Sequence, residues 1–285
     1  MAAGGRFAFV LRRAAAGAAA VALATGAQGS LLQCKALTLD GVDIRRERAV
    51  TAEDHTALLA LVEGVSSATL QWRWRRARAL HDVATAESAM PAAERQAMLE
   101  RALAEVDAAL AAAAAAGKTE GAELGAAWRW RGTILSALTS YMDTKGSIAA
   151  SPRIRDAWVQ AVQLDELDAS AMHLLGRWYC KMASLSWLER TAASVLFGTP
   201  PPATYEEALA WFERAEEAQP GFWLANRVRL ADTLLLLGRP AEAEAWAERA
   251  AAMEVVTADD VASRAELDAM AAKQGWSVTS PPERA

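Results

Sequence analysis

The fold is decided by residues 205–220, which read YEEALAWFERAEEAQP. Ala208, Phe212 and Ala215 recur at intervals of four and three residues, the spacing of one face of an α-helix. Pro220 follows, and proline cannot continue a helix because it lacks the backbone N–H. The small alanines allow a second helix to approach closely, and the aromatic ring fills the remaining space. The segment therefore predicts one helix of a tightly packed helical pair.

Segments on either side supply further helices of the same kind. Upstream, residues 174–179 read LLGRWY, with Gly176 at the expected crossing of two helices. Downstream, an apolar pattern ends at Gly238 and resumes with Ala243 and Ala250. These offsets are typical of a tetratricopeptide repeat, a helical hairpin of about 34 residues that stacks on its neighbours.

Two earlier pairs complete the pattern, one joining residues 72–83 to 91–116 and one joining 127–138 to 154–161. A last helix is expected from Thr257 to Lys273, with Thr257 as its N-cap. The sequence thus predicts an all-α protein, a tetratricopeptide-like α-solenoid of about four helix pairs plus a C-terminal helix.

One pair departs from the regular repeat length. About 20 extra residues, Ser184 to Ala203, separate the helix of Gly176 from that of Ala208, and their apolar residues favour a packed helical extension. We expect four regions: an N-terminal targeting or anchor segment at 1–40, a linker with a short leading helix at 41–70, the repeat domain at 71–275, and a flexible tail at 276–285.

The first forty residues contain no acidic side chain before Asp40, although several basic ones are present. An alanine-rich run from Ala14 to Ala27 is shorter than the roughly 20 apolar residues that span a bilayer. This composition is typical of an organelle-targeting sequence; a secretory signal and a plain disordered tail are the alternatives.

Composition excludes several functional classes. The 285 residues carry a net charge of −5, which argues against a nucleic-acid binder. Two cysteines and three histidines leave too few ligands for a disulfide framework or a thiolate or histidine metal site, so we expect neither a metal nor a cofactor.

The Gly117-Lys118-Thr119 sequence lacks the earlier glycine and the preceding strand of a phosphate-binding loop. No nucleophile stands in a catalytic pattern, so we expect no enzyme and no catalytic residue.

A groove lined by the first helices of the repeats is the main binding candidate. Helical spacing from Gly176 and Trp128 directs four cationic or ionisable side chains toward it: Arg129, His173, Arg177 and Lys181. Arginine pairs well with carboxylates and phosphates, so the hypothetical ligand is an acidic peptide or a lipid phosphate. The alternative is that these arginines bridge neighbouring helices through Asp or Glu.

A second candidate is a basic patch interleaved with tryptophan in residues 72–78, WRWRRAR, whose arginines are Arg73, Arg75, Arg76 and Arg78. It could meet an acidic polypeptide segment or anionic lipid headgroups. The structural alternative is that the tryptophans are core residues and the arginines pair with neighbouring helices.

Residues 173–222 read HLLGRWYCKMASLSWLERTAASVLFGTPPPATYEEALAWFERAEEAQPGF, with an insertion that interrupts the repeat. This segment resembles the regulator of microtubule dynamics family, as do WRWRRARALHDVA from Trp72 and WRWRGTILSALTSYMDTKGSI from Trp128. The resemblance covers about residues 70–255; Glu166 stands where an ordinary repeat carries proline.

The resemblance implies a non-enzymatic adaptor whose partners are microtubules or a tubulin-associated protein, in the cytoplasm and at microtubules or the spindle. One branch of the family is anchored in the mitochondrial outer membrane, tethers it to the endoplasmic reticulum and binds phospholipid. The alternative function is therefore an anionic-phospholipid-binding membrane-contact module, addressed to mitochondria by the N-terminal segment.

Overall fold

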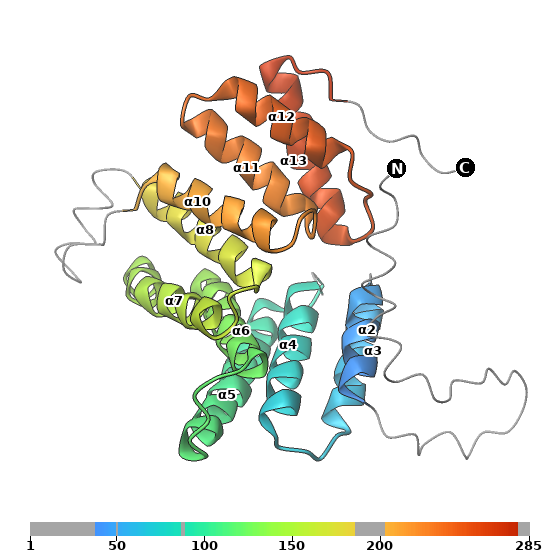
Figure 1. Ribbon diagram of the computed structural model, residues 1–285. Helices are drawn as coiled ribbons and strands as arrows, with labels where there is room; N and C mark the ends of the chain where they lie inside the picture. The colour runs from blue at the N-terminus through green and yellow to red at the C-terminus, as the bar shows by residue number, and fades with distance from the viewer. Residues whose placement is uncertain (1–37, 50, 87–88, 186–202, 279–285) are drawn as a thin grey trace, which may run out of the picture. The chain divides into compact units, whose positions relative to one another are not determined.

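The computed structural model describes residues 38–49, 51–86, 89–185 and 203–278 (Figure 1). These residues form α-helices and one short 3-10 helix, with no strand among them, which confirms the all-α prediction. The elements are α2 (Leu39–Arg48), α3 (Ala52–Glu63), α4 (Leu70–Ala86), α5 (Ala92–Ala115), α6 (Ala122–Leu138), η1 (Thr139–Tyr141), α7 (Thr144–Leu164), α8 (Ala169–Ala183), α10 (Tyr205–Ala218), α11 (Leu224–Leu236), α12 (Pro240–Ala251) and α13 (Ala258–Gln274).

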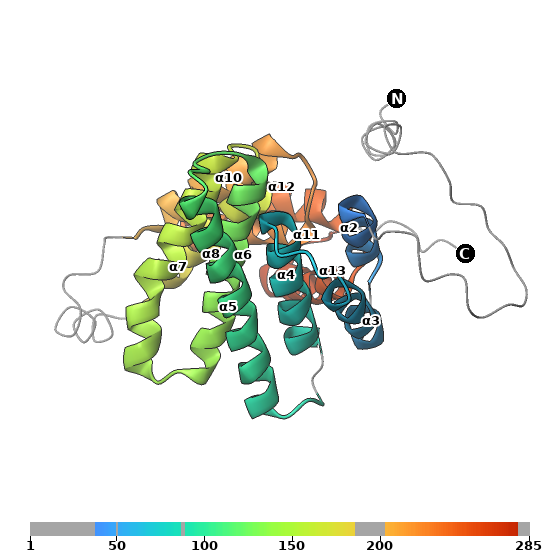
Figure 2. The same ribbon diagram turned by 90° about the horizontal axis from the view of Figure 1, so that it is seen from below.

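The helices pack mainly against their neighbours in sequence, as in a solenoid. Four hairpins are formed by α4 with α5, α6 with α7, α8 with α10, and α11 with α12. First helices also contact one another, α4 beside α6 and α8 beside α11, and α13 packs on α11 (Figures 1 and 2). This arrangement agrees with the expected helix pairs and C-terminal helix.

Each of two hairpins is closed by a glycine that faces an aromatic ring. A Cβ atom at Gly176 would lie 2.6 Å from Cδ1 of Phe212, and one at Gly132 would lie 2.5 Å from Nε1 of Trp158. Any larger residue would force the helices apart, so these glycines fix how closely α8 approaches α10 and α6 approaches α7.

Capping boxes with a threonine at the N-cap start three of the described helices. Thr51, Thr204 and Thr257 each accept a hydrogen bond from the backbone N–H three residues later, and the acidic residue at that position accepts one in return. The predicted cap at Thr257 is therefore present. Gly238, with φ of 71°, follows α11 as expected for a glycine that ends a helix.

One region differs from the sequence-based expectation, and three lie wholly or partly outside the described residues. Residues 41–70, expected to be a linker with one short helix, contain most of α2 and all of α3, and α3 packs on α4. Val42 of α2 is fully buried in the same core cluster as Leu80 of α4. Residues 186–202 of the predicted extension, residues 1–37 of the predicted targeting segment, and residues 279–285 of the predicted tail lie outside the described residues.

Candidate functional site

Arg129, the first predicted groove residue, is tied to the start of α8. Asp168 is the N-cap of α8, and its Oδ1 accepts a hydrogen bond from the backbone N–H of Ala171. Its Oδ2 accepts a second bond from Nε of Arg129 on α6, at 2.8 Å. Arg129 therefore joins α6 to α8, as in the bridging alternative, and its charge is already balanced.

His173 lies in the core rather than at a surface. Its side chain is 1% exposed, and its ring centroid is 4.4 Å from that of Trp223. Nδ1 of His173 lies 3.0 Å from Oδ1 of Asn226, whose Nδ2 donates to the backbone carbonyl of Phe212. Burial lowers the pKa of His173 to about 3, although the Asn226 bond acts in the opposite sense, so the ring is neutral at pH 7. The histidine links α8, α10 and α11.

Arg177 and Lys181 remain as solvent-exposed cations on α8, one helical turn apart. Neither forms an ion pair with another residue in the described part of the chain. Partial desolvation lowers the pKa of Arg177 and the charge of Arg229 on α11 lowers it further, while Asp259 and Glu266 raise it. The two arginines thus stand close enough to repel each other.

A groove lies between α11 and α13, and Arg229, whose charge acts on Arg177, lines it. Its volume is about 580 Å³. It is lined by Arg229, Asp232, Leu235, Leu236, Glu266, Ala269, Met270, Lys273 and Gln274. Arg229 pairs with Glu266 and, at 3.6 Å, with Asp232, whereas Lys273 is exposed and has no ion pair among the described residues. Leu236 is 52% exposed, which leaves an apolar surface beside the charges.

We call this surface the α8–α11–α13 face and define it by Arg177, Lys181, Arg229, Leu236 and Lys273. Helical spacing in the sequence predicts its two α8 residues. The contributions of α11 and α13 were not predicted, although the Arg229–Leu236 spacing of seven residues is itself a helical repeat that places both on one face.

The basic patch at residues 73–78 is paired inside the protein. Asp43 of α2 accepts hydrogen bonds from Arg75 at 2.7 Å and from Arg78 at 2.8 Å, and Glu123 of α6 accepts from Arg75 at 3.0 Å. Arg75 and Arg78 are 5% and 7% exposed. Burial raises the pKa of Asp43, but the Arg75 hydrogen bond and the Arg78 charge outweigh it, and the pKa is lowered overall.

The other two arginines of the patch share one carboxylate. Glu105 of α5 lies 3.5 Å from Nη1 of Arg73 and 3.3 Å from Nη1 of Arg76. Trp74 is buried, and its indole N–H donates to Glu123 at 2.6 Å, while Arg75 lies over its ring at 4.1 Å from the centroid. These contacts match the structural alternative for the patch, because its charges join α4 to α2, α5 and α6.

Among the described residues, no group of three or more His, Cys, Asp or Glu side chains is arranged to hold a metal ion. None of the helices in the described ranges combines the length and apolarity needed to cross a bilayer. Cys180 is half-buried and lies 3.4 Å from Oγ1 of Thr233, and burial raises the pKa of its thiol, which disfavours a reactive thiolate.

Comparison with known proteins places these features in a family. The family model described as regulator of microtubule dynamics protein 1-3 matches residues 40–275. Regulator of microtubule dynamics protein 1 of Rattus norvegicus is 34% identical over 191 residues, which are 66% of this chain and 57% of that protein. Protein 3 of Xenopus laevis is 32% identical over 200 residues, 70% of this chain and 41% of that protein.

The human protein 1 is 35% identical over 135 residues, 47% of this chain and 43% of the relative. The chain thus spans about half the length of the curated relatives it matches. The matched family region begins within α2 and ends just after α13, so it covers all the helices described above. This chain therefore belongs to the family of regulators of microtubule dynamics proteins 1–3.

Proposed function

We propose that the protein is a non-enzymatic helical adaptor that associates with microtubules or with a tubulin-associated protein through the α8–α11–α13 face. The names of its relatives describe regulators of microtubule dynamics, which supports a microtubule-related role. The proposed location is the cytoplasm, at microtubules or the spindle.

The observation that carries the proposal is the pair Arg177 and Lys181. Both cations are exposed and have no carboxylate partner among the described residues, and Arg177 in addition feels the charge of Arg229. Desolvation and Arg229 disfavour the charge on Arg177, and an incoming carboxylate would relieve that repulsion. The face is therefore suited to an acidic polypeptide segment, such as an acidic tail of tubulin.

Co-sedimentation of the full chain with stabilised microtubules tests this proposal. Saturable binding that weakens with added salt is expected. The double variant Arg177→Ala/Lys181→Ala should bind about tenfold more weakly, as expected for the loss of two exposed charge contacts. Lys145→Ala/Arg153→Ala is the matched control, because it removes two exposed cations of α7 that form no ion pair with any described residue. Equal binding by both double variants would contradict the proposal.

A lipid phosphate is the second candidate ligand, favoured by the exposed Leu236 beside the cations. The protein would then be a phospholipid-binding membrane-contact module. Its targeting to mitochondria would depend on residues 1–40, of which 1–37 lie outside the described residues. Flotation of the full chain with vesicles containing anionic phospholipid, compared with neutral vesicles, tests this function. Binding to anionic vesicles without microtubule binding would support it over the adaptor.

A further inference from the structure

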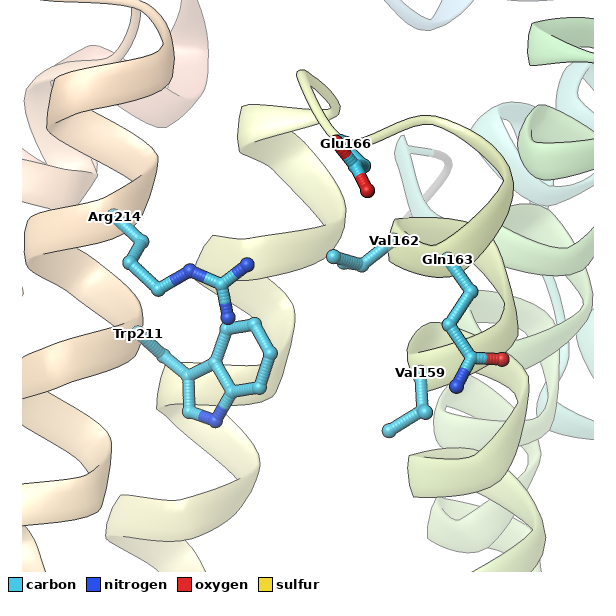
Figure 3. A pocket seen from close by; sticks show the side chains of 6 residues that line it. All are labelled: Val159, Val162, Gln163, Glu166, Trp211 and Arg214. Carbon is cyan, nitrogen blue, oxygen red and sulfur yellow. The ribbon is translucent and has the colours of Figure 1, made fainter.

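A separate pocket opens between α7 and α10, the second helices of two successive hairpins. Its volume is about 430 Å³, and it is lined by Val159, Val162, Gln163, Glu166, Trp211 and Arg214 (Figure 3). None of these residues belongs to the α8–α11–α13 face. A space of this size is large enough for one or two side chains of a peptide.

One wall of the pocket carries a cation held in place by an aromatic ring. The guanidinium carbon of Arg214 lies 4.3 Å from the ring centroid of Trp211, one helical turn earlier on α10. Arg214 is exposed and forms no ion pair with any residue in the described ranges. The stacking limits the freedom of the side chain, so less entropy is lost when it binds a carboxylate.

The opposite wall is apolar and ends in an acid. Figure 3 shows Val159 and Val162 of α7 facing Trp211 across the pocket, with Glu166 at the end of the pocket nearest the α7–α8 turn. Glu166 is exposed and unpaired among the described residues, and it does not reach Arg214. Leu167, the next residue, is 71% exposed, the largest exposure among the large apolar side chains described.

We propose that this pocket docks a short peptide segment of a partner protein, in which an aliphatic side chain lies between an acidic residue and a basic residue. The aliphatic group would pack between Trp211 and the two valines. The acidic residue would pair with Arg214 and the basic one with Glu166. Charge complementarity at the two ends thus sets the direction of the peptide, and the apolar centre supplies the contact area.

The same chain supplies a matched control for the arginine. Residues 210–215 read AWFERA and residues 245–250 read AWAERA. In the second copy, on α12, Arg249 lies 4.5 Å from the ring centroid of Trp246 and is likewise exposed. Arg249 does not line the pocket. Arg249→Gln therefore removes an equivalent stacked cation from an equivalent helix without altering the proposed site.

The test begins with a display library of random peptides selected against the full chain. We expect the enriched peptides to share an aliphatic residue flanked by an acid on one side and a base on the other. A labelled peptide with that consensus is then titrated by fluorescence anisotropy. Arg214→Gln should weaken its binding at least about tenfold, since a charge-assisted contact is lost. Arg249→Gln should leave its affinity unchanged.

Two further variants separate this site from the others. Glu166→Gln should weaken binding of the same peptide and relax the preference for a basic residue at one end. Arg177→Ala/Lys181→Ala should bind the peptide like the unmodified chain, so failure of the microtubule proposal would not affect this one. Thermal unfolding that is unchanged in Arg214→Gln shows that the loss is local.

Three outcomes would overturn the proposal. The first is a selection that yields no common motif, or a motif without the acidic residue. The second is equal binding of the selected peptides to Arg214→Gln and Arg249→Gln. The third is self-association in sedimentation velocity that Arg214→Gln abolishes, which would identify a second copy of the chain as the occupant.

Discussion

Gly176 of α8 packs directly against the ring of Phe212 on α10, so that a Cβ at position 176 would lie 2.6 Å from Cδ1 of the ring. Phe212 is fully buried, and its ring centroid is also 5.4 Å from that of His173. The glycine, the ring and the histidine therefore form the centre of the hairpin that presents Arg177 and Lys181.

Gly176→Ala should destabilise the protein. A methyl group gains about 1 kcal/mol in helix propensity but must displace a buried aromatic ring, which costs about 1–3 kcal/mol in an overpacked core and more where helices must separate. We expect a net fall in the free energy of unfolding in a urea titration. The double variant Gly176→Ala/Phe212→Leu should lose less stability than the two single variants together, because leucine at position 212 leaves room for the added methyl group. Strict additivity would show that the two residues do not compete for space.

Stability should fall with acidification because of His173. The folded-state pKa of about 3 lies below the ordinary value of 6.5, so the unfolded chain binds the extra proton between these values. The contribution of the neutral ring to the free energy of unfolding is fully present above about pH 6.5 and is lost as the pH falls towards 3. Lowering the pH from 7.5 to 5.5 should reduce the free energy of unfolding by about 1.4 kcal/mol through this group.

His173→Gln isolates that contribution, because glutamine does not titrate. Urea unfolding at pH 7.5 and 5.5 should show a smaller decrease in the variant than in the unmodified chain. Asp82 does not contribute in this window: burial raises its pKa, but His81 and Arg46 outweigh that effect and lower the pKa to about 2. Equal pH dependence of the two proteins would contradict the assignment.

Asp43→Asn should destabilise the N-terminal part of the domain. The substitution removes the charge shared by Arg75 and Arg78 while both guanidiniums stay buried. Breaking a buried ion pair on one side costs about 3 kcal/mol. Glu242→Gln is the control, since its ion pair with Arg239 is exposed, and it should leave chemical unfolding unchanged. Equal behaviour of the two variants would mean that α2 is not held by Asp43.

Arg129→Ala should affect stability and not binding. The hydrogen bond from Arg129 to Asp168, the N-cap of α8, is partly buried. Losing this bond should lower the free energy of unfolding by about 2 kcal/mol, as measured by thermal or urea unfolding. Microtubule co-sedimentation of the folded variant should match that of the unmodified chain. If the variant co-sedimented more weakly but were no less stable, Arg129 would be part of the binding surface.

The helices were predictable because their signals are local. The glycine and the small residues that permit close packing recur at helical spacing, and the caps lie within four residues of the helices they start. Predicting α2 as part of the fold was harder, because its ten residues are mostly charged and, among those whose burial is described, only Val42 is fully buried.

The binding candidates were less predictable because burial and pairing depend on distant residues. Helical spacing places His173 and Arg177 on one face, yet Asn226, 53 residues later, lies against the histidine in the core. Asp43 and Glu123, which pair with Arg75, lie 32 and 48 residues away from it. Composition reveals the arginines, but only the packing of the hairpins determines which of them retain free charge.

The exposed cations of the α8–α11–α13 face are proposed to bind an acidic surface of the microtubule. The most direct measurement compares co-sedimentation of the full chain with intact microtubules and with microtubules stripped of their acidic tails by limited proteolysis. We predict that the unmodified chain binds stripped microtubules with the affinity that Arg177→Ala/Lys181→Ala shows for intact ones. The affinity of the variant itself should fall little further when the microtubules are stripped. Equal affinity of the unmodified chain for intact and stripped microtubules would contradict the claim.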